Sequence, residues 1–215
     1  MRKIRNIKSE AQEELKEKEK KMASILDFLN TDTGKDFIER SGKEVNESPE
    51  KVKSVLGMAL PMMIGALKKN TSTSEGAEKI ASELDKDRHN GSILNSIGTG
   101  GISGFLSEGS GIVNHIFGGK QNKIVQAVSS ATGMDASKVE KLIKMAAPVV
   151  MGVLGKQKRK DNVEKGGISN LIGSVMGSNS SHDQSLLETF LDADGDSPVA
   201  EEAVGKLFGG KGKSR

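Results

Sequence analysis

The residues best suited to binding a ligand form an acidic segment near the C-terminus, DADGDSPVAEE, at residues 192–202. Three aspartates occupy positions 1, 3 and 5 of an EF-hand-like loop, a spacing that lets carboxylate oxygens converge on one calcium ion. The pattern is incomplete, because Ser197 replaces the turn glycine and Ala203 replaces the bidentate glutamate at position 12. The candidate ligands are Asp192, Asp194, Asp196 and, as a substitute for that glutamate, Glu202. An acidic turn that caps the following helix is the favoured interpretation, and weak calcium binding at these ligands is the alternative.

Two basic clusters, Lys68-Lys69 and Lys156-Gln-Lys-Arg-Lys160, follow the most apolar segments of the chain. Cations near a helix C-terminus offset its dipole, so we expect both clusters to be solvated helix caps. Nucleic-acid binding is the alternative for these clusters. It is disfavoured because the formal charge of +3 lies entirely in residues 1–21, and because the chain has no Tyr or Trp on which bases could stack.

Neither the histidines nor the serines form a recognisable catalytic pattern. His89, His115 and His182 lie in separate segments, and the chain has no Cys to join them in a zinc site. We therefore expect each histidine to be a surface or capping residue. No Gly-x-Ser-x-Gly motif is present, and no acid–base pair can be nominated. The sequence predicts a protein that is not an enzyme and holds no cofactor apart from the candidate calcium ion.

The elements that would position these groups are predicted from an internal repeat. Residues 51–69, KVKSVLGMALPMMIGALKK, match residues 138–156, KVEKLIKMAAPVVMGVLGK, at an offset of 87. Further matches, at offsets of 85 and 91, pair Phe105-Leu106 with Phe190-Leu191 and the two Phe-Gly-Gly-Lys segments at 117–120 and 208–211. We therefore expect a tandem repeat of two units of about 90 residues, 22–120 and 121–211.

Each unit is predicted to be helical, since apolar residues recur at spacings of three and four and no segment alternates as a strand would. Ser48-Pro49 and Ser137-Lys-Val-Glu140 are predicted N-termini of the repeated helices. Pro61 and Pro148 must kink or split these helices. Gly65 and Gly152, one turn later, are expected to admit a neighbouring helix. Glycine-rich connectors should separate short helices at Ser92–Ile97 and Ile168–Met176, and the methionines should fill the core.

The ends of the chain differ from the two units. Residues 1–21 form a charged leader that is either a solvated helix or an extension preceding a true start at Met22, and residues 212–215 form a basic tail. No secretory signal is recognisable, and the longest apolar stretch, 55–67, is too short to span a membrane. We therefore expect a cytoplasmic location.

The segment Met22-Ala-Ser-Ile-Leu-Asp-Phe-Leu29, the paired Pro…Gly helices and the Phe-Gly-Gly endings resemble the YidB-like family of bacterial proteins, domain-of-unknown-function family 937. The resemblance covers about residues 22–211 and implies an all-helical bacterial protein with no established activity. It supplies no catalytic residues. We expect a non-enzymatic protein-interaction or scaffold module that binds an unknown protein partner or a second copy of itself. A nucleic-acid-binding regulator and a weak calcium-binding protein are the alternatives.

Overall fold

The computed structural model of the chain describes residues 25–99 and 102–175. These residues form helices and short connections without any strand, so the predicted all-α class is confirmed. In chain order the elements are α2 (Ile25–Phe28), α3 (Asp32–Val45), α4 (Pro49–Asn70), α5 (Ser74–Leu84), the 3₁₀ turn η1 (Asp87–His89), α6 (Ser92–Thr99), α7 (Ser103–Phe117), η2 (Gly118–Lys120), α8 (Gln121–Thr132), α9 (Ala136–Lys160), η3 (Lys165–Gly167) and α10 (Ile168–Val175).

The two long helices are the repeated segments of the sequence. Helix α4 begins as predicted, with the Ser48 hydroxyl accepting from the backbone N–H of Lys51 and proline in the first turn. Helix α9 begins two residues earlier than predicted, because Asp135 and not Ser137 is its N-cap. Both helices continue through their internal proline, so neither is split in two.

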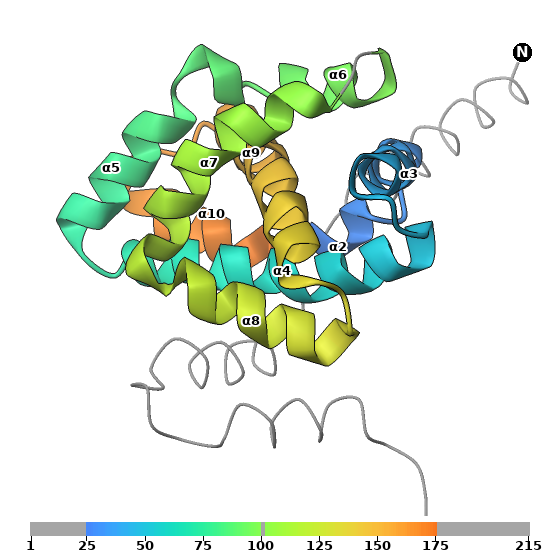
Figure 1. Cartoon of the computed structure of the whole chain (residues 1–215). Helices are drawn as coiled ribbons and strands as arrows, with labels where there is room; N and C mark the ends of the chain where they lie inside the picture. The colour runs from blue at the N-terminus through green and yellow to red at the C-terminus, as the bar shows by residue number, and fades with distance from the viewer. Residues whose placement is uncertain (1–24, 100–101, 176–215) are drawn as a thin grey trace, which may run out of the picture.

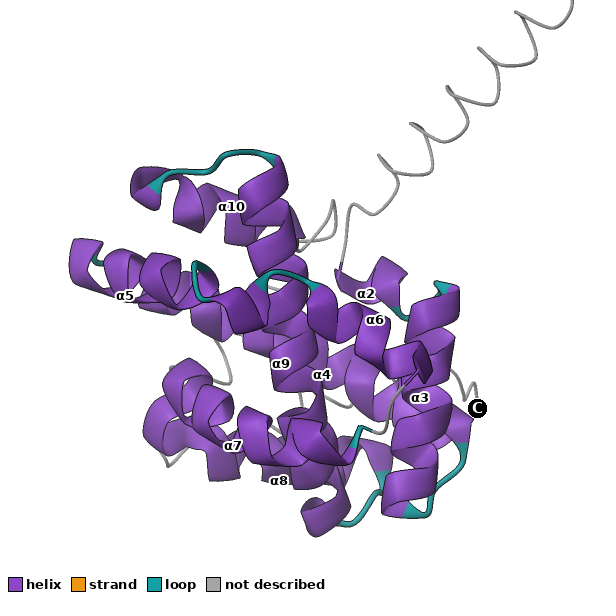
Figure 2. Ribbon diagram, turned by 90° about the horizontal axis from the view of Figure 1, so that it is seen from above, coloured by secondary structure: helices purple, strands orange, loops and turns teal. Residues whose placement is uncertain are grey.

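Helix α9 lies at the centre of the molecule, crossed by α7 and surrounded by α3, α4, α6 and α8 (Figure 1). Nearly every residue from Leu142 to Gly155 is buried. The view from above shows α5 and α10 on one side of the α4–α9 pair, and α7 and α8 on another (Figure 2). The predicted close approach at Gly152 is confirmed, because an added Cβ there would lie 2.6 Å from Cγ2 of Ile93 in α6.

Helix α7 corrects the prediction that glycines 98–111 separate short helices. Gly104, Gly109 and Gly111 lie inside one continuous helix of 15 residues. Gly109 is required by packing and not by a turn, since an added Cβ would lie only 2.6 Å from the carbonyl carbon of Lys144 and would overlap its oxygen. The backbones of α7 and α9 therefore cross in direct contact. The short helices α6 and α10 match their predicted bounds closely, although Met176 lies outside the described residues.

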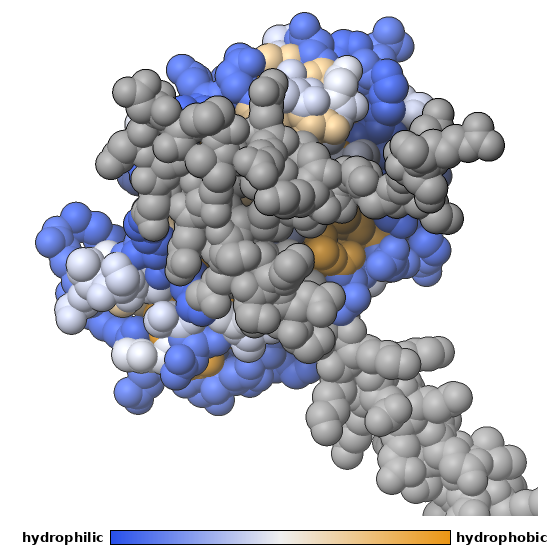
Figure 3. Space-filling model, turned by 90° about the horizontal axis from the view of Figure 1, so that it is seen from below, coloured by the Kyte–Doolittle hydropathy of each residue, from blue (hydrophilic) through white to orange (hydrophobic). Residues whose placement is uncertain are grey.

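The buried apolar side chains form one continuous core that includes five of the methionines predicted to fill it, Met62, Met63, Met134, Met145 and Met151. Seen from below, the described surface is mostly hydrophilic, with a few small apolar areas (Figure 3). Within the described residues, no helix combines the length and apolarity needed to cross a bilayer.

Candidate functional site

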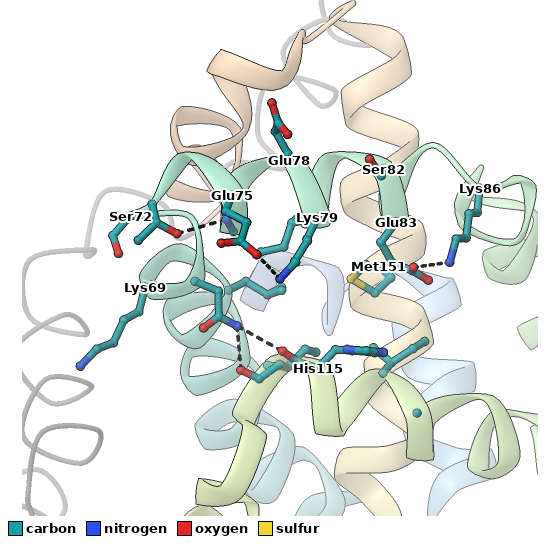
Figure 4. A pocket seen from close by; sticks show the side chains of 18 of the residues that line it. Lys69, Ser72, Glu75, Glu78, Lys79, Ser82, Glu83, Lys86, His115 and Met151 are labelled. Carbon is teal, nitrogen blue, oxygen red and sulfur yellow. Dashed lines mark hydrogen bonds and ion pairs between the residues drawn. The ribbon is translucent and has the colours of Figure 1, made fainter.

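An open pocket of about 990 Å³ lies between α5, the end of α4 and the second half of α7 (Figure 4). Its position follows from two local contacts. Asn70, the last residue of α4, donates from Nδ2 to the carbonyls of His115 and Ile116, at 3.2 and 3.1 Å. Gly76 lets the first turn of α5 lie against the Asn70 carbonyl, because a side chain at position 76 would overlap that oxygen. Thr73 caps the same turn. These contacts fix α5 and α7 relative to α4.

The floor of the pocket is apolar. It comprises Leu67, Ile112, Ile116 and Met151, all part of the buried core, together with the half-buried Ile80 of α5. These side chains come from four helices, so the floor depends on the packing of the whole domain. Apolar groups at the base of a recess are suited to receiving an aliphatic or aromatic side chain.

The rim of the pocket carries both signs of charge in equal number. The acidic members are Glu75, Glu78, Glu83 and Glu108, and the basic members are Lys69, Lys79, Lys86 and Arg88. Glu75 and Lys79 form an exposed ion pair of 2.6 Å on α5, and the hydrogen bond from Lys79 lowers the pKa of Glu75 (Figure 4). The balanced rim does not provide the one-sided positive field that a nucleic-acid backbone requires.

Glu83 is the centre of a charged cluster at one end of the pocket. Its carboxylate accepts from Nζ of Lys86 at 2.5 Å and from the Arg88 guanidinium, and lies 3.2 Å from Nε2 of His89. Burial raises the pKa of Glu83, but the hydrogen bonds from Lys86, Arg88 and His89 outweigh burial and lower the pKa to about 2. The carboxylate is therefore held ionised at neutral pH and ties α5 to η1.

His89 corrects the prediction of a surface or capping histidine, because its side chain is 0% exposed. Burial lowers its pKa, and the neighbouring Glu83 only partly opposes this effect. Nε2 lies 3.1 Å from Nε of Arg88 and 3.2 Å from the Glu83 carboxylate, so its tautomer decides whether it accepts from Arg88 or donates to Glu83. Nδ1 is buried without a hydrogen-bond partner. His115 is exposed, as predicted, and lines the pocket. The third histidine, His182, lies outside the described residues.

The second basic cluster is more than a solvated cap. Arg159 donates to the carbonyls of His89 and Gly155 through Nη1, and to those of Asp85 and Lys86 through Nη2, at 3.0 to 3.1 Å. Lys158 pairs with the Asp85 carboxylate at 2.5 Å. These groups join the end of α9 to the turn after α5 and support the charged end of the pocket.

The predicted calcium ligands Asp192, Asp194, Asp196 and Glu202 lie outside the described residues, so the calcium hypothesis stays a prediction. Within the described ranges, no group of three or more His, Asp or Glu side chains could hold a metal ion. The pocket was not predicted from the sequence. The charged residues spread along 75–86 indicate only an exposed helix.

The fold and the pocket define an all-helical protein with an amphiphilic recess. The family model described as "Bacterial protein of unknown function (DUF937)" matches residues 27–157, more than half of the chain. The chain belongs to this family, which confirms the resemblance seen in the sequence. The match spans α3 through most of α9 and includes all elements of the pocket. No curated protein and no solved structure matches the chain.

Proposed function

We propose that the protein is a non-enzymatic interaction module that holds a segment of a partner protein in the pocket between α5 and α7. The proposal depends chiefly on the combination of an apolar floor with a rim of four carboxylates and four cations. A peptide offers matching chemistry, since apolar side chains can enter the recess while its charged groups and backbone meet the rim.

We also propose that the chain is a tandem repeat, in which α3, α4 and α6 correspond to α8, α9 and α10. The offset between the copies is 87 residues across the long helices. At the short helices α6 and α10 the offset falls to 75 residues, because residues 91–98, GSILNSIG, match residues 166–173, GGISNLIG. The second copy is thus about twelve residues shorter, close to the 11 residues of α5. The wall of the pocket is then an addition to the repeated plan, which supports a role in binding over a role in folding.

The absence of catalysis is part of the proposal. The most strongly perturbed carboxylate of the described chain, Glu83, is neutralised by Lys86 and Arg88, and so is unsuited to accept a proton near neutral pH. His89 is fully buried and does not line the pocket. A general base must reach its substrate and accept a proton. Glu83 lines the pocket, but its cations hold it ionised with a low pKa, and His89 does not reach the pocket.

Nucleic-acid binding is the weaker alternative. Two of the four basic residues in the cluster 156–160, Lys158 and Arg159, are engaged in contacts within the protein. Weak calcium binding remains an independent hypothesis for the segment 192–202, tested by titration calorimetry of wild type and Asp194→Ala.

A paired-variant experiment tests the interaction proposal. Ile80→Glu places a charge at the edge of the apolar floor, whereas Leu94→Glu makes the same change at a half-buried residue of α6 that does not line the pocket. Both variants and the wild type would be purified from the native host, and the co-purifying proteins quantified by mass spectrometry. We expect a partner that is retained by Leu94→Glu and lost from Ile80→Glu. Identical partner sets for the two folded variants would refute the proposal.

A further inference from the structure

The two long helices differ in how fully one face is covered. In α9, Met145 and Pro148 are buried, and α7 crosses the helix with Gly109 against the backbone of Lys144. The residues 87 positions earlier in α4 are Gly57, Met58 and Pro61. All three are partly exposed, and a Cβ built on Gly57 meets no atom of the described structure within 4 Å. The face of α4 that matches the α7 crossing, defined here as the Gly57–Pro61 face, is therefore open.

The chain contains a second copy of the segment that covers α9. In α7 the residues Ile112, Val113, Ile116 and Phe117 are buried, and Gly-Gly-Lys follows them. At an offset of 91, the C-terminal residues 203–211, AVGKLFGGK, repeat this apolar spacing and end with the same Phe-Gly-Gly-Lys. In that register the small residue Ala200 takes the place of Gly109, the point at which α7 touches α9. Residues 198–208 thus carry the pattern needed to cover a long helix.

The packing of the short helices indicates where this second copy belongs. Helix α6 lies on α9, with Ile93 against Gly152, while α10 contacts both α4 and α9, and a Cβ built on Gly173 would lie 3.8 Å from Nζ of Lys68 in α4. Each short helix therefore contacts the long helix of the other half, and α10 also contacts that of its own half. Helix α7 follows α6 and covers the same helix, α9. By the same rule, the segment that follows α10 covers α4, and the residues between 175 and 198 can extend about 70 Å, ample for this distance.

We propose that residues Pro198–Phe208 dock on the Gly57–Pro61 face of α4, as α7 docks on α9. The proposal concerns an intramolecular surface distinct from the α5 pocket, so it does not depend on the proposed function. The occupant is this segment because it repeats the apolar spacing of α7 and because the tether is long enough. If a partner protein covered this face, the chain would need neither the repeated apolar spacing nor a tether of this length.

The absence of Cys from the chain provides a direct test by disulfide trapping. At the matched crossing, a Cβ built on Gly109 lies 3.1 Å from Cα of Lys144, which places the two backbones within the span of a disulfide. In the full chain at low concentration, Gly57→Cys with Ala200→Cys should form an intramolecular disulfide rapidly on oxidation, identified by its linked peptides. The matched control joins Ala200→Cys with Gly104→Cys in the first turn of α7, where an added side chain also meets open space.

The expected result is oxidation at least ten times faster for the Gly57 pair than for the Gly104 pair. Equal rates, or a disulfide formed only between two molecules, would overturn the proposal. A second measurement needs no cysteine. Phe208→Asp should accelerate the oxidation of Met58 by hydrogen peroxide several-fold and leave the buried Met145 unchanged as an internal reference. An unchanged Met58 rate would also overturn it.

Discussion

The crossing of α7 over α9 leads to a prediction of opposite effects from two identical substitutions in one helix. A Cβ at Gly109 would lie 2.6 Å from the carbonyl carbon of Lys144, and this obstacle is backbone in the central helix. Overpacking of a core typically destabilises by about 1–3 kcal/mol, and a backbone obstacle cannot rotate away. Alanine recovers about 1 kcal/mol of helix propensity. We expect Gly109→Ala to lower the free energy of unfolding by about 2 kcal/mol.

Gly111 is the matched control, because it is exposed in the same helix and an added Cβ meets nothing within 4 Å. Gly111→Ala should raise the free energy of unfolding by up to about 1 kcal/mol. Urea unfolding followed by circular dichroism measures both changes, and the melting temperature should fall by about 4–8 °C for Gly109→Ala. If the two variants shift stability in the same direction, the close crossing is not as described.

Three contacts around the pocket give further predictions. Glu83 has a folded-state pKa of about 2, below its unfolded value, so its contribution to stability is present above about pH 4.5 and is lost as the pH falls toward 2. Glu83→Gln should reduce this loss in urea titrations at several pH values, while Glu78→Gln on the same helix should not. Arg159→Met should lower the free energy of unfolding by about 2 kcal/mol, because it removes charged hydrogen bonds that include those to the partly buried carbonyls of His89 and Gly155. The exposed Lys160→Met should have little effect on the same unfolding curves. Asn70→Ala should lower the free energy of unfolding by about 1 kcal/mol in the same urea titrations. An unchanged free energy of unfolding would show that water replaces the hydrogen bonds from Asn70 to α7.

The parts of the fold that could be predicted from sequence are those governed by local rules. Helical periodicity, the Ser48-Pro49 start of α4 and the short helices α6 and α10 all follow from spacing and capping chemistry. Helix α7 could not be predicted in this way, because glycine has a low helix propensity and Gly109 therefore indicates a turn between helices. Its true role is set by the tertiary contact with Lys144, about which the local sequence carries no information.

The candidate site escaped prediction for a related reason. His89 lies in a strongly charged stretch, Asp-Lys-Asp-Arg-His, in which nothing indicates burial. It is buried because Gly155 of α9, whose added Cβ would overlap the His89 carbonyl oxygen, lets η1 lie directly against that helix. Arg159 then holds the same turn through its carbonyl groups. The pocket is thus assembled from α4, α5, α7 and α9 by contacts between residues 45 to 74 positions apart.

Differences between the two halves of the chain are more informative about function than their similarities. Matching segments such as α4 and α9 follow one pattern because both must bury apolar faces in a shared core, and such a pattern identifies a scaffold. Packing of the core does not explain why the second half has no counterpart of α5. It also does not explain why α4 has Gly57 at the position that matches Lys144 of α9. One difference creates the pocket with its mixed-charge rim, and the other leaves an open face on α4. If the chain is the repeat proposed above, these departures are where binding should be sought first.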